Sequence, residues 1–347
     1  MSFIHHANRV ACIIGMTLLV NGCAGGPGQY TNKWFHQSKS YDHEKAFQSW
    51  LKTVRPDAIY QGVSPKTVDQ AFSQIRYRDD IIELDQKQPD VTRTFDQYIS
   101  STVSPAKIEK ARQAYADNKL LIDDVSRRYG VQPQYIVSLW GVESNFGANM
   151  GKFPVVESLA VLAFEGRRRD FFKGELINAL KILDQGDIGF DDMKGSWAGA
   201  MGQTQFMPSS FFSYAVDFNK DGKKDIWTTK DDAFASIANY LSSLNWNRTL
   251  SWGKQVKLPQ DFNYDQVGLT QGKTVRDWKE LGVKDSDGST LDGNVDTQAW
   301  IVVPDKVRTP ESKAYLVYSN YKVIMKWNKS TYFATSVGLL ADAVANH

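Results

Sequence analysis

Cysteine is nearly absent from this chain of 347 residues: Cys12 and Cys23 are the only two, and both lie near its start. The rest of the chain therefore has no disulfide, no thiolate metal site and no cysteine nucleophile. A large charge of one sign is also missing, and the net charge of +2 gives no electrostatic case for a nucleic-acid partner. The composition, 42% hydrophobic and 23% charged, is ordinary for a globular chain long enough for two or three domains.

Long hydrophobic runs are lacking too. The run Val10–Val20 is too short to cross a bilayer and is typical of the apolar region of a signal peptide. It leads to Val20–Cys23, which resembles a bacterial lipoprotein processing site, although Asn21 fits it imperfectly. We predict a signal peptide over residues 1–22, lipidation of Cys23 and a polar tether over residues 23–40. A plain secreted protein or an uncleaved anchor are the alternatives.

Helical patterns fill most of the remaining chain, and a β-rich character follows Trp252. The predicted fold is therefore mainly α, with a small β-rich insertion. Domain boundaries are placed as follows: an N-terminal helical domain at 41–130, a catalytic core at 131–252, a β-rich domain at 253–318 and a C-terminal segment returning to the core at 319–347. Helices are expected at 133–143, 164–184, 232–244 and 332–345, and strands at 254–258, 297–303 and 314–317. Residues 105–130 are expected to form one long helical pattern.

Glu143 is the candidate catalytic residue. It lies at the end of a predicted helix, on the same stripe as Ile136, Leu139 and Trp140. Partial desolvation and the negative end of the helix dipole both disfavour a charged carboxylate, so we expect a raised pKa suited to a general acid. Taken alone, such a Glu is more often a solvated surface residue.

Two longer motifs surround this residue: Gly141–Gly147 contains it, and Ser196–Ser209 follows about fifty residues later. From about Tyr41 to the C-terminus the chain resembles the lytic murein transglycosylase B family. That resemblance implies a goose-type, lysozyme-like helical catalytic domain. It implies action on peptidoglycan glycan strands in the periplasm, anchored by lipid to the outer membrane of a Gram-negative bacterium, a location that Ala24 after the cysteine also favours. It implies no cofactor for catalysis.

The resemblance also implies roles for particular residues. Glu143 matches the catalytic acid and base. Positions that line sugar subsites or contact the glycan or its peptide stem are matched by Ser196, Gln205, Tyr240, Arg167, Arg168, Trp327 and Asn328. Trp327 departs from the family, which usually has Tyr at that position: it keeps a stacking face but loses the phenolic hydroxyl, which puts a hydrogen-bonding role there in doubt.

The residues themselves agree with these roles without deciding them. The small residues of Gly195–Gly202 let a backbone approach a ligand closely, although a tight packing segment would have the same composition. The run Arg167–Arg169 can pair with carboxylates of a peptide stem, or can be only a solvated face.

Neither motif contains a second carboxylate beside Glu143. Ordinary glycosidases use two. A transglycosylase needs one, because the C6 hydroxyl of N-acetylmuramic acid attacks and closes a 1,6-anhydro ring. A hydrolytic muramidase and a non-catalytic peptidoglycan-binding lipoprotein are the alternatives.

The segment 217–228 repeats the first half of an EF-hand loop, with oxygen-bearing side chains at Asp217, Asn219, Asp221 and Asp225, which are positions 1, 3, 5 and 9, and a glycine at the sixth position. The twelfth position is Thr228 rather than Glu. The family resemblance implies a longer loop closed by a later Asp, with Asp232 the best fit and Asp231 its rival, and with Lys223 contributing its backbone oxygen. We expect a structural Ca²⁺ here, with a plain polar turn as the alternative.

Replacing Cys23 by alanine should convert the protein from membrane-associated to soluble, because the several acyl chains of a processed lipoprotein anchor stably whereas one chain binds only marginally. Fractionation of cells that express each form tests this. Retention of Cys23→Ala in the outer-membrane fraction, under salt that strips peripheral proteins, would show that the anchor is elsewhere.

Overall fold

The structure is a computed structural model that describes residues 33–87, 93–305, 307–309 and 311–345. The predicted signal peptide, Cys23 and the first part of the tether lie outside the described residues. The described chain divides into two compact units. The first comprises residues 33–87 and 147–233, and the second comprises residues 93–146 and 234–345. The boundaries predicted from sequence character, at residues 130, 252 and 318, stay predictions.

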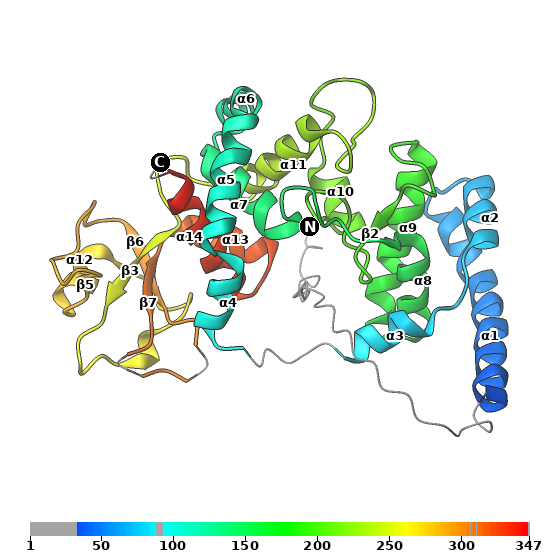
Figure 1. Cartoon of the computed structure of the whole chain (residues 1–347), viewed down its shortest axis with the longest axis horizontal. Coiled ribbons are helices and arrows are strands. Elements are labelled where there is room, and N and C mark those ends of the chain that lie inside the picture. The colour runs from blue at the N-terminus through cyan, green and yellow to red at the C-terminus, as the bar shows by residue number, and fades with distance from the viewer. Residues whose placement is uncertain (1–32, 88–92, 306, 310, 346–347) are drawn as a thin grey trace, which may run out of the picture. The chain divides into compact units, whose positions relative to one another are not determined.

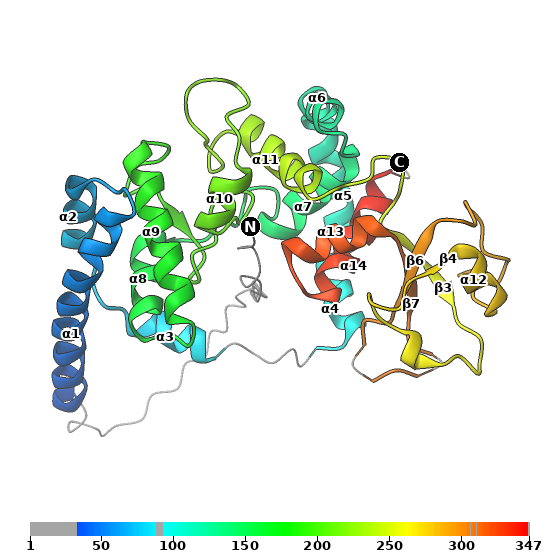
Figure 2. The same cartoon turned by 180° about the vertical axis from the view of Figure 1, so that it is seen from behind.

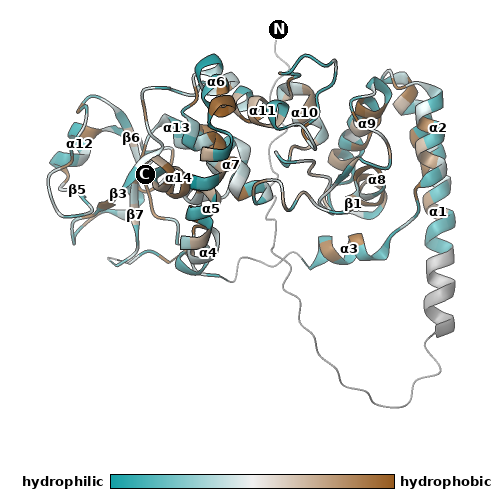
Figure 3. Cartoon of the chain, turned by 45° about the horizontal axis from the view of Figure 1, so that its top comes forward, coloured by the Kyte–Doolittle hydropathy of each residue, from teal (hydrophilic) through white to brown (hydrophobic). Residues whose placement is uncertain are grey.

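The first unit is helical apart from one small two-stranded sheet. Its elements are α1 (Lys33–Tyr60), α2 (Pro65–Gln74), α3 (Asp79–Gln86), β1 (Phe153–Pro154), α8 (Val155–Glu165), α9 (Arg169–Gln185), β2 (Lys194–Gly195) and α10 (Pro208–Tyr214). Helices α8 and α9 pack side by side, as Figures 1 and 2 show from opposite directions. Helices α1 and α3 pack on α8, and α2 and α10 on α9. Brown and teal residues both occur along α9 in Figure 3, as expected for a helix with one buried side.

The second unit combines a helical group with a sheet. Its helices are α4 (Phe95–Thr102), α5 (Pro105–Asp117), α6 (Lys119–Tyr129), α7 (Pro133–Ser144), α12 (Val275–Glu280), α13 (Ser319–Trp327) and α14 (Thr331–Ala345), together with most of α11 (Lys230–Ser243) and the 3₁₀ turn η1 (Tyr264–Gln266). Helix α14 packs along α7, α5, α4 and α13. This packing places a helix from the end of the described chain directly against α7.

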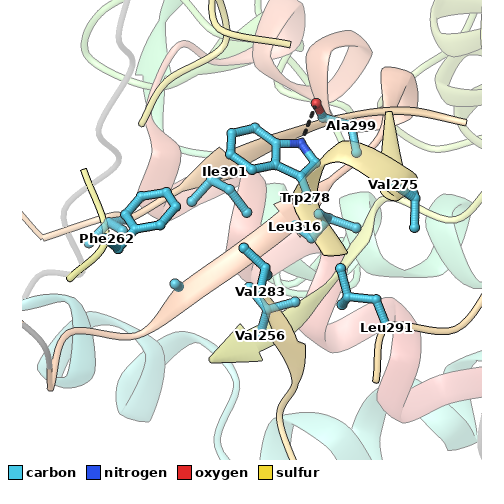
Figure 4. Close-up of a cluster of buried hydrophobic side chains, with 11 residues drawn as sticks. Val256, Phe262, Val275, Trp278, Val283, Leu291, Ala299, Ile301 and Leu316 are labelled. Atoms are coloured by element: carbon cyan, nitrogen blue, oxygen red, sulfur yellow. Dashed lines mark hydrogen bonds between the residues drawn. The ribbon is translucent and has the colours of Figure 1, made fainter. Parts of the chain in front are cut away.

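The sheet of this unit has five strands in the order β4-β6-β7-β3-β5, and every pairing is antiparallel. Its strands are β3 (Gly253–Lys257), β4 (Lys273–Thr274), β5 (Lys284–Asp285), β6 (Gln298–Val302) and β7 (Ala314–Val317). Trp278 of α12 is fully buried against this sheet, and its indole N–H donates to the Ala299 carbonyl oxygen at 3.1 Å (Figure 4). The β-rich segment therefore has a hydrophobic core of its own.

The predicted fold class, mainly α with a small β-rich insertion, is confirmed. The local signals behind it are visible in the structure. Ser64 and Ser104 each cap a helix that begins with Pro, and their side chains accept hydrogen bonds from backbone N–H groups three residues later. Gly130 ends α6 in the left-handed conformation.

Helix α1 begins at Lys33, inside the predicted tether 23–40, where the glycines and proline of that segment all precede this residue. The role of the segment as a tether stays a prediction. Two expected helices are wrong in their limits. The single helix predicted over 164–184 is broken at Gly166, whose extended backbone separates α8 from α9. The pattern over 105–130 is two helices that meet at Asn118. Amphipathic spacing continued across both breaks, so it did not reveal them.

Trp252 connects the sheet to the helices of the second unit. Its side chain is fully buried, and its indole N–H donates to Asp342 of α14 at 2.9 Å. Its backbone N–H donates to the Tyr135 hydroxyl of α7 at 2.9 Å. Gly338 makes room for the indole, since a Cβ there would lie 2.2 Å from a ring carbon. Burial raises the pKa of Asp342 to about 6, and the hydrogen bond from Trp252 partly opposes this shift.

Asp342→Asn should change how stability depends on pH. A carboxyl whose pKa is higher in the folded state stabilises the fold when protonated, and this contribution is lost as pH rises from about 4 through about 6. Asn keeps an acceptor for Trp252 but cannot ionise. The free energy of unfolding of the variant minus that of the wild type should therefore be up to about 3 kcal/mol higher at pH 8 than at pH 4. Urea unfolding at both pH values measures this, and an equal difference at the two would contradict it.

Candidate active site

Helix α7 carries the candidate acid, and it is buried on nearly all sides. Pro133 occupies its first turn, where the absence of a backbone N–H costs no hydrogen bond. Buried residues continue from Tyr135 to Gly141, so the helix has more than the single apolar stripe expected from sequence. The Ser138 hydroxyl donates to the Val337 carbonyl oxygen of α14 at 2.6 Å. The neighbouring helices thus fix both the position and the rotation of α7.

A sharp corner follows Glu143. Asn145 and Phe146 have positive φ angles of 52° and 62°, and Gly147 continues with 79°. Gly141 allows Phe146 to fold back on the helix, because a Cβ there would lie 2.7 Å from the Phe146 ring. Trp140 packs edge-on against the same ring at 5.5 Å. The Gly-x-Glu-x-Asn-Phe-Gly pattern is therefore explained locally by this corner.

Two lysines of α5 hold the corner from outside. Lys107 Nζ donates to Asn145 Oδ1 at 3.1 Å, and Lys110 Nζ donates to the Asn145 backbone oxygen at 3.2 Å. Each ammonium also lies 5.3 Å from the centre of the Phe146 ring. Burial, reinforced by Lys110, lowers the pKa of Lys107 to about 8. Sequence analysis missed these residues, whose role depends on the packing of α5 against α7.

The carboxyl of Glu143 is partly buried at the end of α7. Its Oε1 accepts a hydrogen bond from the indole N–H of Trp327, the last residue of α13, at 2.6 Å. The Trp327 ring lies 4.6 Å from the ring of Tyr240 on α11. The structure therefore brings together three predicted site residues: Glu143, Trp327 and Tyr240. Trp327 does make a hydrogen bond, which corrects the doubt raised by the loss of the phenolic hydroxyl.

Burial raises the pKa of Glu143 to about 8, and the hydrogen bond from Trp327 acts in the opposite direction. The same carboxyl acts on Tyr98 of α4. The pKa of the Tyr98 phenol is raised mainly by burial and also by the charge of Glu143. Glu143 is therefore protonated at neutral pH, which a group that donates a proton in the reaction requires.

Asn328 follows Trp327 and is also buried, with 6% of its surface exposed. Its Oδ1 accepts from the Ser330 backbone N–H at 3.0 Å, and Ser330 in turn caps the start of α14 through the Phe333 N–H. Within the second unit, Asn328 thus shapes the turn that follows Trp327. Its predicted contact with substrate stays a prediction.

Ser196 and Gln205 belong to the first unit, in a loop closed by the antiparallel bridges Gly195–Met201 and Met201–Phe206. The Ser196 Oγ accepts from the Ala200 N–H at 3.0 Å. The protein itself fills the space beside the glycines: a Cβ at Gly195 would lie 2.2 Å from the Ala200 oxygen, and one at Gly202 would lie 2.6 Å from the Ile226 oxygen. Tight internal packing therefore explains these two glycines, the alternative that the composition had left open.

Gln205 is 8% exposed and has a positive φ of 51°, a conformation that costs energy for a residue with a side chain. Its Nε2 donates to the carbonyl oxygens of Met150 and Gly202 at 3.1 and 2.8 Å. Both amide hydrogens are thereby used within the loop, so the amide oxygen is the atom that can accept from a ligand. The loop holds this side chain in one orientation.

The end of the same motif is braced by α9. Glu175 is 4% exposed, and its carboxylate accepts from the Ser209 backbone N–H at 2.8 Å and from the Ser209 hydroxyl at 2.6 Å. Burial raises the pKa of Glu175, and the bonds from Ser209 lower it again in part. Glu175 is a functional candidate that sequence analysis missed, because nothing in its local pattern marks it as buried.

Arg167 and Arg168 both interact with residues of the first unit. Arg167 forms an ion pair with the buried Asp85, with Nε and Oδ2 3.2 Å apart, and also donates to the Asp85 backbone oxygen. The Arg168 guanidinium lies 5.4 and 5.0 Å from the rings of Phe171 and Phe172. Arg167 thus has a structural partner that the sequence did not indicate, and the predicted contacts with glycan or peptide stem stay predictions.

The EF-hand-like loop has the turns of a cation loop. Asp217, Asn219 and Asp221 each accept hydrogen bonds from backbone N–H groups within 217–223. Asp232 is fully buried, and its two oxygens accept from the backbone of Phe218 and Asp225 at 2.7 and 2.8 Å. Burial raises the pKa of Asp232, and the nearby charge of Asp217 adds to this. Ca²⁺ prefers hard oxygen donors of this kind, and binding of the ion by this loop stays a prediction.

In the part of the chain that the structure describes, no cluster of three or more His, Cys, Asp and Glu side chains is arranged to hold a metal ion. No described helix has both the length and the apolar character to cross a membrane.

Comparison with known families identifies the chain. A family model described as the transglycosylase SLT domain matches residues 46–342. The chain belongs to this family. Among curated proteins, this SLT domain is 28% identical to membrane-bound lytic murein transglycosylase B of Escherichia coli K12 over 306 residues, which cover 82% of the chain and 79% of that protein.

Solved structures agree. SltB3 of Pseudomonas aeruginosa, in complex with NAG-NAM-pentapeptide, is 39% identical, with a TM-score of 0.83 over 87% of this chain and 80% of that one. Slt35 of Escherichia coli, a lytic transglycosylase in complex with calcium, is 26% identical, with a TM-score of 0.72 over 85% and 92%. The predicted lysozyme-like fold of this SLT domain and its place among lytic transglycosylases are confirmed.

Proposed function

We propose that Glu143 is the single catalytic acid and base of this chain, which is a lytic transglycosylase acting on peptidoglycan glycan strands. The observation that carries the proposal is the carboxyl at the end of α7, which burial keeps protonated at neutral pH and which Trp327 holds in place. The 1,6-anhydro sugar bound by SltB3, in its complex with NAG-anhNAM-pentapeptide, is the product class that one carboxyl can form.

The reaction needs no water and no cofactor. Glu143 donates its proton to the glycosidic oxygen as the bond from C1 of N-acetylmuramic acid breaks. The C6 hydroxyl of the same sugar then attacks C1, and its proton passes to the Glu143 carboxylate as the 1,6-anhydro ring closes. The acid is regenerated, and the bond to N-acetylglucosamine has been cut without hydrolysis.

The remaining site residues are proposed to bind substrate. Tyr240 and Trp327 offer aromatic faces next to Glu143, which suit the apolar faces of sugar rings. The Gln205 amide oxygen suits a sugar hydroxyl or the N–H of an acetamide. Ser196, Asn328, Arg167 and Arg168 complete the proposed set.

The proposed location is the periplasm, with the chain anchored to the outer membrane through a lipidated Cys23. The basis is the lipoprotein-like sequence Val20–Cys23. The membrane-bound relative of Escherichia coli is consistent with it.

Digestion of purified sacculi by the wild-type enzyme should give fragments that end in 1,6-anhydro-N-acetylmuramic acid. Such ends are about 18 Da lighter than hydrolysed ends, because no water is added, and borohydride does not reduce them. Mass spectrometry with and without borohydride measures both properties. Reducible ends carrying ¹⁸O from labelled water would show a muramidase instead.

Glu143→Gln is the matched control for this experiment. It preserves size and hydrogen-bonding capacity but cannot transfer a proton, so cleavage should fall at least about a hundredfold while the melting temperature stays close to wild type. Activity within a few-fold of wild type would remove Glu143 from the mechanism. Absence of cleavage by the wild type itself would favour a peptidoglycan-binding role.

We also infer that the loop binds one structural Ca²⁺ through Asp217, Asn219, Asp221, the backbone oxygen of Lys223 and Asp232. Asp225 is left out, since its carboxylate accepts from Trp227 and Thr228 instead. A bound cation would neutralise the facing carboxylates and stabilise the loop that α11 follows. It takes no part in the chemistry.

Adding Ca²⁺ to chelator-treated protein should raise its melting temperature, because a ligand bound only by the folded state stabilises that state. The double variant Asp217→Ala, Asp221→Ala should lose the response. Asp231→Ala is the matched control and should keep it, since Asp231 is the rival of Asp232. An unchanged response in the double variant would mean that the ion binds elsewhere. A response lost only in Asp231→Ala would mean that Asp231, rather than Asp232, closes the loop.

A further inference from the structure

The hydrogen bond between Trp327 and Glu143 joins two residues with different chemical freedom. A carboxyl group can carry its proton on either oxygen. An indole N–H can only donate. Within the described residues, the bond from Trp327 to Oε1, at 2.6 Å, is the one hydrogen bond of the Glu143 carboxyl, so Oε2 has no donor there.

The donor therefore decides which oxygen carries the proton. If Oε1 were protonated, it would be a hydroxyl oxygen, which accepts more weakly than a carbonyl oxygen, and the hydrogen bond from the indole would be weakened. A proton on Oε2 leaves Oε1 as the carbonyl oxygen that accepts from Trp327. The bond therefore keeps its strength in both the acid and the carboxylate form only when Oε2 is the oxygen that titrates.

We propose that Trp327 is a positioning residue that reserves Oε2 of Glu143 for both proton transfers of the reaction. This inference rests on the proposed function. The Oε2 proton passes to the glycosidic oxygen as the bond to C1 breaks, and the C6 hydroxyl proton passes to Oε2 as the new C–O bond forms. Oε1 stays bound to the indole throughout, so the carboxyl does not rotate between the two steps.

The identity of this side chain matters. A tyrosine, the usual residue at this position by resemblance to the family, has a hydroxyl that donates or accepts. It could accept from a protonated Oε1 as readily as it could donate to an unprotonated one, so either oxygen of Glu143 could carry the proton. The indole removes that choice. The Tyr240 ring, 4.6 Å from Trp327, limits how far the indole can turn away.

The same bond sets the pH range of activity. Donation to the carboxylate stabilises the ionised form and lowers the pKa of Glu143 from the value that burial alone would give. Activity that requires the acid form falls as pH rises through this pKa. Titratable groups on the elements around Glu143 and α7 include Tyr98 on α4, Lys107 and Lys110 on α5, Tyr240 on α11 and Asp342 on α14, and a substitution at Trp327 leaves all of them in place.

The test is the pH profile of kcat/KM for Trp327→Phe on soluble glycan strands, between pH 5 and pH 10. Phe keeps an aromatic ring beside Tyr240 but has no N–H. We expect kcat at pH 7 to fall about tenfold or more, because the carboxyl now samples both orientations. We expect the alkaline limb to move up by about one pH unit, the size of a hydrogen bond to a charged group.

Two further variants make the result specific. Trp327→Tyr restores a donor, so its alkaline limb should return close to the wild-type position while kcat recovers only in part. Trp300→Phe is the matched control: this tryptophan lies in the same unit, on β6, with its ring 3.4 Å from the Lys322 ammonium, and its loss should leave the profile unchanged. Circular dichroism and melting temperature establish whether each variant is folded. If Trp327→Phe does not fold, the pH profile of Trp327→Tyr is used instead.

The outcomes separate the inference from the function on which it rests. An alkaline limb that moves up in Trp327→Phe and returns in Trp327→Tyr supports the positioning role. If the alkaline limb of Trp327→Phe stays in place while kcat falls, Trp327 is only a stacking residue and the inference is overturned. The proposed function would still hold in that case if the wild-type products have 1,6-anhydro ends. Wild-type products with reducible ends overturn the function itself.

Discussion

The burial of a carboxylic acid without a cation is the constraint on which the site depends. An exposed Glu143 would be ionised at neutral pH and could not donate a proton. Burial reverses this only if α7 is covered on its other sides, and α5, α6 and α14 provide that cover. The corner after Glu143, held by Gly141 and the two lysines of α5, then ends the helix within two residues of the acid.

The same principle recurs among the other buried acids that are described. Glu175 accepts from Ser209, Asp342 from Trp252, and Asp232 from two backbone N–H groups, and in each case the donors are neutral. Neutral donors satisfy the oxygens without the strong fall in pKa that an arginine or lysine would cause. Among the described residues, the buried Asp85 instead has a charged partner, Arg167. This chain therefore contains several acids that are protonated more easily than surface carboxylates.

Much of this could be predicted from the sequence, where the signal is local. Capping by Ser64 and Ser104, the left-handed end at Gly130 and the strand Ala314–Val317 follow from residue preferences within a few positions. The candidate acid was assigned through the family resemblance of the two motifs around it, because its place at the end of an apolar helix taken alone is more typical of a solvated surface residue. The failures involve contacts between distant residues or breaks that do not disturb a pattern, such as the bend at Gly166.

The two most informative misses show why such contacts escape sequence reasoning. Arg167 was expected to contact the glycan or its peptide stem, which stays a prediction, and its ion pair with Asp85, 82 positions away, was not foreseen. Trp327 was expected only to stack, because the comparison with Tyr directed attention to the lost hydroxyl. Its indole N–H supplies a hydrogen bond instead, and only the approach of α13 to the end of α7 could reveal this.

The separation of 184 residues between Glu143 and Trp327 has a consequence for biosynthesis. A ribosome completes α7 long before it makes α13 and α14, so the nascent chain carries an acid whose cover and whose donor do not yet exist. A fragment cut anywhere between the two would be in the same condition. The Glu143 carboxyl thus gains its cover and its hydrogen-bond donor only after α13 and α14 have been synthesised and docked.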